Sequence, residues 1–297
     1  MITKAPHKGS LKLAIASGKG GTGKTTVAVS LALSLAERHP LYLDCDVEEP
    51  NAGLFLRPDL KERREVGQMI PEVDPDRCTA CGRCAEVCRF GAIIVISKQV
   101  MVFPELCHGC GSCTLNCPEG AIHEVFDAFG LLERGVAGPI AFAQGTLDVG
   151  KALATPIIRQ LKQWAISEDV SGRPVILDAP PGNACPVVET MRGADGVLLV
   201  TEPTPFGLHD LRVAVEVARD ELGLPVAVIV NRDGAGDAAV DEYCAGENIP
   251  VVMRIPLDRG IAEAYARGMP LVEARPAYRQ AFQDLYDDLK IMWGVEE

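Results

Sequence analysis

The chain has 297 residues, of which 47% are hydrophobic and 24% charged, a composition typical of a globular protein with one or two domains. Acidic residues outnumber basic ones by 41 to 29 and no basic stripe is visible, so nucleic acid is not an expected partner. No apolar run approaches the roughly 20 residues of a membrane-spanning helix, and the first residues lack the apolar stretch of a signal peptide. We therefore expect a cytoplasmic protein that binds neither nucleic acid nor membrane.

Residues 17–26 have the sequence Ser-Gly-Lys-Gly-Gly-Thr-Gly-Lys-Thr-Thr, between an apolar run and a helical pattern. A strand, a glycine-rich loop and a helix are the context of a phosphate-binding loop, because the glycine N–H groups and the helix dipole converge on an anion. Lys24 would reach the outer phosphates of ATP, and the Thr25 hydroxyl would bind Mg²⁺. The other residues predicted to surround the phosphates are Gly18, Gly20, Gly21, Thr22, Gly23 and Thr26.

Lys19 directly follows the first glycine of this loop. The arrangement resembles the deviant Walker A motif of the MinD/Mrp/nitrogenase-iron-protein group of dimeric ATPases. The resemblance implies that Lys19 crosses a dimer interface to the nucleotide of the partner. The working form would then be a nucleotide-loaded homodimer, or a dimer with a close paralogue. The alternative is that Lys19 is an ordinary solvated charge of the loop.

The next apolar run, at residues 41–44, predicts a second strand that ends in an acidic loop. By the same resemblance, Asp46 in this loop corresponds to the switch I aspartate that orients the attacking water. Asp44 either supports the metal or is an ordinary carboxylate at a strand end. Residues 58–70 are charged and show no periodicity, which predicts a linker.

Residues 72–124, here called the cysteine module, contain eight of the eleven cysteines in two runs of identical C-x₂-C-x₂-C-x₃-C spacing. This spacing is typical of bacterial ferredoxins with two [4Fe–4S] clusters, in which the fourth cysteine of each run ligates the other cluster. Structural zinc, the alternative, usually takes cysteine pairs set further apart. Arg89 stands where proline is usual. The predicted ligand sets are Cys78, Cys81, Cys84 and Cys117 for one cluster, and Cys107, Cys110, Cys113 and Cys88 for the other.

In the rest of the chain, apolar runs rich in Val, Ile and Leu alternate with helical patterns, which predicts a parallel sheet covered on both faces. We expect an α/β fold of the P-loop NTPase type, with a doubly wound, mostly parallel sheet formed by residues 1–68 and 128–297. A small α+β ferredoxin-like domain would be inserted at 69–127. The expected strands lie at 139–143, 174–178, 196–201, 225–231 and 250–255, and the expected helices at 151–166, 208–222, 237–247, 261–267 and 276–293.

Two further segments resemble nucleotide-binding elements of the same family. Asp178 ends an apolar strand and opens the sequence Asp-Ala-Pro-Pro-Gly, which resembles the Walker B and switch II segment. The resemblance implies that Asp178 holds Mg²⁺ or its water and that the Gly182 N–H senses the γ-phosphate. Asn231, together with the loop that contains Pro256 and Asp258, resembles the adenine pocket, where an asparagine amide can hydrogen-bond to a purine edge.

Cys185 follows Asp178 by seven residues, the position at which the nitrogenase iron protein has a ligand for a cluster shared between subunits. That protein supplies two cysteines per subunit, and no second one matches here. Cys185 is therefore either a dimer-bridging metal or cluster ligand, or an incidental thiol. Cys45 and Cys244 are expected to be small buried apolar side chains.

These motifs predict an ATPase in which Mg²⁺, Lys24, backbone N–H groups and Lys19 of the neighbour stabilise the charge that develops during hydrolysis. Two functions share all of them. One is ATP-gated electron transfer from two [4Fe–4S] clusters to a protein partner. The other is ATP-dependent assembly or transfer of an iron–sulfur or other metal cluster to an acceptor protein. A partition or positioning role is disfavoured by the acidic C-terminal helix.

Overall fold

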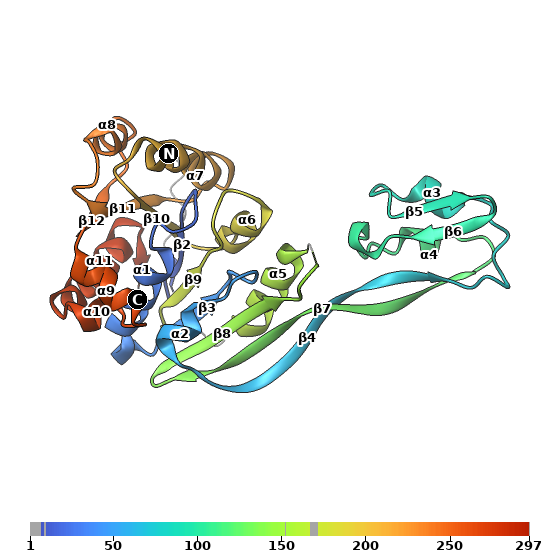
Figure 1. Cartoon of the computed structure of the whole chain (residues 1–297), viewed down its shortest axis with the longest axis horizontal. Coiled ribbons are helices and arrows are strands. Elements are labelled where there is room, and N and C mark those ends of the chain that lie inside the picture. The colour runs from blue at the N-terminus through green and yellow to red at the C-terminus, as the bar shows by residue number, and fades with distance from the viewer. Residues whose placement is uncertain (1–6, 9, 152, 167–171, 297) are drawn as a thin grey trace.

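The computed structural model describes residues 7–8, 10–151, 153–166 and 172–296. It shows an α/β body and, held out from it on two long strands, the cysteine module (Figure 1). The central sheet has nine strands in the order β12-β11-β10-β2-β9-β3-β8-β7-β4. Neighbours from β12 to β8 are parallel, whereas β7 is antiparallel to both β8 and β4. Their bounds are β2 Lys12–Ala16, β3 Leu41–Asp44, β4 Asp59–Val73, β7 Ile122–Ala137, β8 Ile140–Leu147, β9 Val175–Asp178, β10 Gly196–Thr201, β11 Val226–Asp233 and β12 Val251–Pro256.

Helices cover both faces of this sheet, which is why its strands are apolar on both sides. In β2, Ala14 and Ala16 belong to one hydrophobic core, and Leu13 and Ile15 belong to the other. The first core is completed by α5 (Ala154–Ala165), α6 (Cys185–Met191), α7 (Pro205–Val215) with its π-helical continuation η3 (Glu216–Glu221), and α8 (Ala239–Gly246). The second is completed by α1 (Lys24–Ser34), α2 (Ala52–Leu56), α9 (Arg259–Ala266), α10 (Leu271–Ala274) and α11 (Ala277–Met292). The predicted doubly wound, mostly parallel sheet is confirmed.

The predicted elements of the body agree with the observed ones within a few residues. The strand expected at 139–143 is β8, which re-enters the sheet beside β3. The helix expected from residue 208 begins earlier, at Pro205, because the Thr204 hydroxyl accepts a hydrogen bond from Gly207 N at 3.0 Å. The C-terminal helix packs on the core through Phe282, Leu285 and Leu289. The remaining short elements of the body are β1 (His7–Lys8), which pairs with β13 (Val295–Glu296), and η1 (Ala36–Arg38).

The linker predicted at 58–70 is wrong, because residues Asp59–Val73 form the strand β4. Residues 59–65 of this edge strand are exposed on both sides of the sheet, so their sequence lacks the alternation by which a strand is recognised. Charges across the β4–β7 pair compensate one another: Arg63 bonds Glu133 at 2.8 Å, and Arg134 bonds Glu62 at 2.6 Å. Before Gly130, β7 pairs only with β4, and this two-stranded part, residues 122–129 of β7 with the facing residues of β4, is called the ribbon.

The cysteine module lies between the outer ends of β4 and β7. It contains α3 (Arg83–Val87), the hairpin β5 (Ile93–Ile96) and β6 (Gln99–Val102), η2 (Pro104–Leu106) and α4 (Ser112–Leu115). Its buried core consists of Cys84, Ile93, Cys113 and Ile122. In the described part of the chain, no helix is both long and apolar enough to cross a membrane.

Candidate functional site: a nucleotide cradle and a cysteine module

The glycine-rich loop lies between β2 and α1, at the carboxyl end of the sheet, where ligands of such folds bind. Gly23 precedes α1 with φ 97°, and a Cβ there would lie 2.4 Å from Asn231 Nδ2. At Gly18 a Cβ would lie 2.3 Å from the carbonyl oxygen of Asp210 in α7. Side chains at these two positions would therefore displace the loop, so its path requires glycine.

Lys24 is buried at the start of α1, and its Nζ donates to the Lys19 carbonyl oxygen at 3.5 Å. Burial lowers the pKa of the Lys24 ammonium, while the nearby carboxylates of Asp178 and Asp46 raise it. The structure thus brings three of the predicted catalytic residues, Lys24, Asp46 and Asp178, together at the carboxyl end of the sheet.

Asp178 ends β9 and is almost completely buried. Its Oδ2 accepts a hydrogen bond from the Tyr42 hydroxyl at 2.7 Å, whereas no described residue is hydrogen-bonded to its buried Oδ1. Burial raises the pKa of Asp178 to about 6, and Tyr42 and Thr25 oppose this rise. A carboxylate oxygen without a partner beside a threonine hydroxyl fits the hard oxygen ligands that Mg²⁺ prefers.

The two acidic residues of the loop after β3 differ in what they contact. Asp44 is buried, and its two oxygens accept hydrogen bonds from the backbone N–H groups of Asp46, Asn51 and Ala52 at 3.0–3.1 Å. It therefore shapes the loop. Asp46 is partly exposed near Lys24, and burial raises the pKa of its carboxyl to about 6.

A cavity of about 280 Å³ lies next to the loop, between β11, β12 and α9. The predicted residues Asn231, Pro256 and Asp258 line it, as do Gly21, Gly23 and Thr26 from the loop. Asn231 also fastens the loop, because its Nδ2 donates to the Thr22 carbonyl oxygen at 2.7 Å and its Oδ1 accepts from Arg232 N at 2.9 Å. Each end of this amide retains one further hydrogen-bonding capacity.

Asp258 has a mainly structural set of contacts. It caps α9 by accepting from the N–H groups of Gly260 and Ile261, and it is paired with Arg275 at 3.1 Å. The apolar wall of the cavity comes from Leu257, which lies in the predicted loop, and from Ile261 and Tyr265, which sequence reasoning missed. A strand–loop–helix unit that follows an asparagine is too common a pattern to have identified them.

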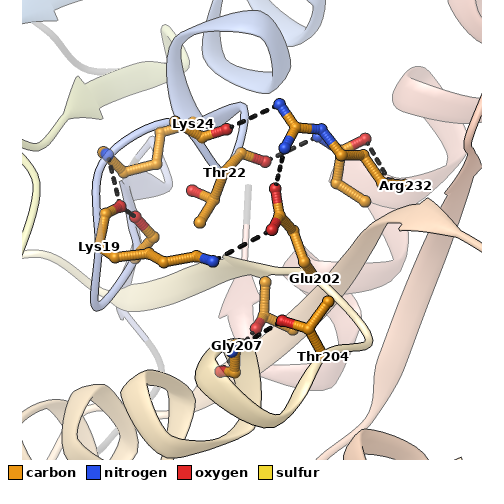
Figure 2. Close-up of polar contacts among 11 residues, drawn as sticks. Lys19, Thr22, Lys24, Glu202, Thr204, Gly207 and Arg232 are labelled. Carbon is orange, nitrogen blue, oxygen red and sulfur yellow. Dashed lines mark hydrogen bonds and ion pairs between the residues drawn. The ribbon is translucent and has the colours of Figure 1, made fainter. Parts of the chain in front are cut away.

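Lys19 forms an ion pair within its own chain. Its Nζ lies 3.1 Å from Oε2 of Glu202 (Figure 2). The other carboxylate oxygen of Glu202 binds Arg232, which also donates to the Gly21 carbonyl oxygen. Gly182, with φ 95°, uses its N–H to donate to the Ser17 carbonyl oxygen at 3.2 Å. A β-carbon at Gly20 would be 3.8 Å from Pro181 of the same segment, so the phosphate loop and the predicted switch II segment are in contact.

The cysteines of the module gather as two sets. Cys78, Cys81, Cys84 and Cys117 line a common cavity. The Cys107 thiol has its pKa raised, first by burial and then by its neighbours Cys110 and Cys88. The fourth cysteine of each run therefore lies beside cysteines of the other run, the placement that the predicted exchange of ligands needs.

Backbone N–H groups point at the sulfurs in the same way in both runs. Cys78 and Cys107 each accept from the N–H two residues later at 3.4 Å, and Cys88 and Cys117 each accept from the N–H four residues later at 3.3 Å. Such donors suit thiolate ligands, so this donor set fits an iron–sulfur cluster. In the described part of the chain, no group of three or more His, Cys, Asp or Glu side chains is arranged for a single metal ion.

The three other cysteines lie in the body. Cys185 is exposed and is the first residue of α6. Cys45 and Cys244 are buried in the core, as predicted, and burial raises the pKa of Cys244 to about 11.

This fold, with a glycine loop, a buried strand-end aspartate and a base-sized cavity, defines a P-loop ATPase. The chain belongs to the CobQ/CobB/MinD/ParA nucleotide binding domain family (CbiA), whose family model matches residues 13–271. It is 30% identical to an uncharacterized protein of Methanocaldococcus jannaschii, over 94% of this chain and 96% of that one. It is 25% identical to the iron-sulfur cluster carrier protein of Pyrococcus abyssi, over 100% of this chain and 92% of that one.

Solved structures share the fold. The septum site-determining protein MinD of Pyrococcus horikoshii, complexed with Mg-ADP, superimposes with a TM-score of 0.56 at 20% identity and covers 96% of this chain and 98% of its own. The cell division ATPase MinD of Pyrococcus furiosus gives a TM-score of 0.55 at 22% identity, over 95% and 99%. The resemblance to the MinD and Mrp group stated from the loop sequence is confirmed.

Proposed function

We propose that this protein is a cytoplasmic, dimeric ATPase that gates electron transfer from two [4Fe–4S] clusters in its cysteine module to a redox protein partner. The observation that carries the proposal is a continuous set of contacts from the ATPase loop that contains Asp46 to the second cysteine run. The contacts at its body end reinforce strand pairs that the sheet already forms, β3 with β8 and β8 with β7.

The contacts begin at Val47, next to Asp46. The Val47 carbonyl oxygen accepts a hydrogen bond at 2.7 Å from the N–H of Leu147, the last residue of β8. The N–H of the next residue, Asp148, donates to the carbonyl oxygen of Phe129 in β7 at 3.0 Å. Three residues on, Lys151 Nζ binds both carboxylate oxygens of Asp127 at 3.0 and 3.2 Å. These contacts give a path by which a change in the loop would reach the base of the ribbon.

At the module end, Gln68 in β4 is the strand partner of Asp127. Its Nε2 donates to the Cys107 carbonyl oxygen at 2.8 Å, and a Cβ at Gly109 would lie 3.1 Å from the Met69 carbonyl oxygen. Gln68, Glu105, Asp127 and Lys151 line one small cavity, so the module and the body also meet here. The second cysteine run thus rests on the same strand pair that the ATPase loop contacts.

In the proposed cycle, Lys24 neutralises the outer phosphates and Asp46 orients water for attack. Thr25 and Asp178 would hold Mg²⁺, which screens the phosphate charge. Lys19 of the second copy would complete the site. The eight module cysteines would hold the two clusters, which supply one-electron chemistry. Each turnover would pass one electron to the partner, and a low-potential one-electron donor would replace it.

The test uses the full chain purified anaerobically. We expect about eight iron atoms per chain, visible and electron paramagnetic resonance spectra that differ between Mg-ATP and Mg-ADP, and faster electron transfer to a redox acceptor with ATP after reduction by dithionite. Lys24→Ala should keep its iron and lose the ATP dependence. Equal transfer rates with and without ATP, or iron far below eight atoms, would contradict the proposal.

A second function, transfer of an iron–sulfur or other metal cluster to an acceptor protein, is favoured by two observations. The relative from Pyrococcus abyssi is named an iron-sulfur cluster carrier protein, and Cys185 is exposed where it could meet a second copy. For this function, ATP-dependent cluster transfer to an apo-acceptor should survive Cys88→Ala and Cys117→Ala but fail with Cys185→Ala. Cys244→Ala is the control, because this thiol is buried in the body. Transfer that is independent of Cys185 would exclude this role for it.

A further inference from the structure

We propose that Glu202 is a positioning residue for Lys19, one that holds the Lys19 ammonium against its own chain until a second, nucleotide-loaded copy takes it over. The inference rests on the role proposed above for Lys19 and deepens it. It concerns three residues, here called the Glu202 cluster: Lys19 from the phosphate loop, Glu202 after β10, and Arg232 near the end of β11.

Glu202 is buried, with 6% of its surface exposed, and both of its carboxylate oxygens are used. Oε2 accepts from Lys19 Nζ at 3.1 Å, and Oε1 accepts from Arg232 at 2.5 Å (Figure 2). A buried carboxylate between two cations is a strong site for a lysine side chain, so the geometry directs Lys19 toward β10.

Arg232 makes this arrangement reversible. It donates to the Gly21 carbonyl oxygen at 3.1 Å as well as to Glu202, so it is tied to the phosphate loop independently of Lys19. When Lys19 leaves, Glu202 keeps one cation and is not left as an uncompensated buried charge, which would be strongly unfavourable. The Lys19 side chain is about one-third exposed and is therefore able to exchange partners.

The competitor for Lys19 is a triphosphate presented by the second copy. It carries several negative charges, whereas Glu202 offers one that it already shares with Arg232. The exchange is therefore favourable only when a loaded second copy is present, and the Glu202 cluster sets the protein and ATP concentrations at which two copies associate. Without the carboxylate, Lys19 would be available at all times.

The experiment measures association of the full-length protein by analytical ultracentrifugation with Mg²⁺ and a non-hydrolysable ATP analogue. Glu202→Gln is expected to lower the dissociation constant of the dimer by up to about 5-fold, the effect of removing one partly exposed ion pair. Binding of the analogue to the monomer should change less than about 2-fold, because Lys24 and the loop N–H groups are untouched. Lys19→Gln should weaken the dimer, and the double variant should behave as Lys19→Gln.

Two further variants separate positioning from folding. Glu189→Gln removes another buried carboxylate that is paired with two arginines, Arg159 at 3.1 Å and Arg192 at 3.8 Å, and should associate as the wild type does. Glu202→Asp keeps a charge for Arg232 while shortening the reach to Lys19, and should associate more tightly than the wild type even if Glu202→Gln folds poorly.

The outcomes distinguish the positioning role of Glu202 from the role of Lys19 in the dimer. If Lys19→Gln weakens the dimer while Glu202→Gln and Glu202→Asp match the wild type, the positioning role of Glu202 is wrong and the role of Lys19 stands. If Lys19→Gln associates as tightly as the wild type, both roles are wrong.

Discussion

The body and the cysteine module are built on different amounts of buried apolar surface. The body has an extensive core on each face of its sheet, with large side chains such as Tyr42, Phe142 and Phe282 almost completely buried. The core of the module consists of two isoleucines and two cysteines. A core of that size rarely supports a fold unaided, so we expect the module, unlike the body, to depend on the clusters that its cysteines are proposed to hold.

The largest expected effect tests this difference directly. Cys113→Ala removes a predicted ligand that is also part of the module core, so iron should fall from about eight to about four atoms per chain or fewer. The amides of β5 and β6 should lose protection from hydrogen exchange, while those of the body keep it. Cys244→Ala, equally buried in the body, is the control and should change neither quantity. A module that stays protected without its iron would contradict the comparison.

In the body, Asp46→Asn should lower ATP hydrolysis about 100-fold or more, since it removes the group proposed to orient the attacking water. It should also stabilise the nucleotide-free protein at pH 7. The Asp46 carboxyl has its pKa raised from 3.8 to about 6, so the folded state binds more protons between these values and stability falls as pH rises through them.

Calorimetry without Mg²⁺ checks this second effect of Asp46→Asn. The melting temperature should rise by about 2 °C at pH 7, and the gain should vanish below pH 4. If Asp46→Asn were less stable than the wild type at pH 7, burial of the ionised Asp46 carboxylate would not destabilise the folded protein.

Tyr42→Phe should have a smaller effect on hydrolysis. It removes the donor to Oδ2 of Asp178, which should lower kcat about 10-fold and raise the Mg²⁺ concentration required, since an unpaired buried acceptor loses about 1–3 kcal/mol. Tyr286→Phe makes the same change in a buried tyrosine of α11 and should leave hydrolysis unchanged. Equal Mg²⁺ dependence of the two variants would exclude a role for Tyr42 at Asp178.

The smallest effect concerns the link between the two regions. Lys151→Met removes the ion pair with Asp127 at the base of the ribbon, and should roughly halve the ATP-induced change in the cluster spectra while leaving hydrolysis intact, as befits a pair worth under about 1 kcal/mol. Asp287→Asn breaks a comparable pair with Arg38 inside the body and should leave the spectra unchanged. If the ATP-induced change in the cluster spectra were as large in Lys151→Met as in the wild type, the ion pair would have no role in the link, and Gln68 would be the next residue to replace.

The sequence predicted the body well, because its strands are buried on both faces and its phosphate loop needs glycine at fixed positions. It also predicted which cysteines gather, since ligand spacing is a local property of the chain. It failed at β4, whose exposed charges follow no period, and it did not anticipate that Asp258 caps a helix as well as lining the cavity.

The residues missed by the sequence act across large separations in the chain. Tyr42 lies in an apolar strand and looks like a core residue until its hydroxyl is seen on Asp178, 136 positions away. Glu202 and Lys19 are 183 positions apart. Pairings of this kind depend on the order of strands in the sheet, which local patterns do not contain.

The exposed charges of β4 have a consequence for how copies of this protein meet. The margin of an open sheet has unpaired backbone N–H and C=O groups, with which a strand of a second chain can pair, and such pairing can lead to fibrous aggregates. From Lys61 to Glu65 that margin carries five consecutive ionic side chains, which would have to lose water for a second strand to pair there. The long arm can therefore remain uncovered without offering an apolar edge to a second chain.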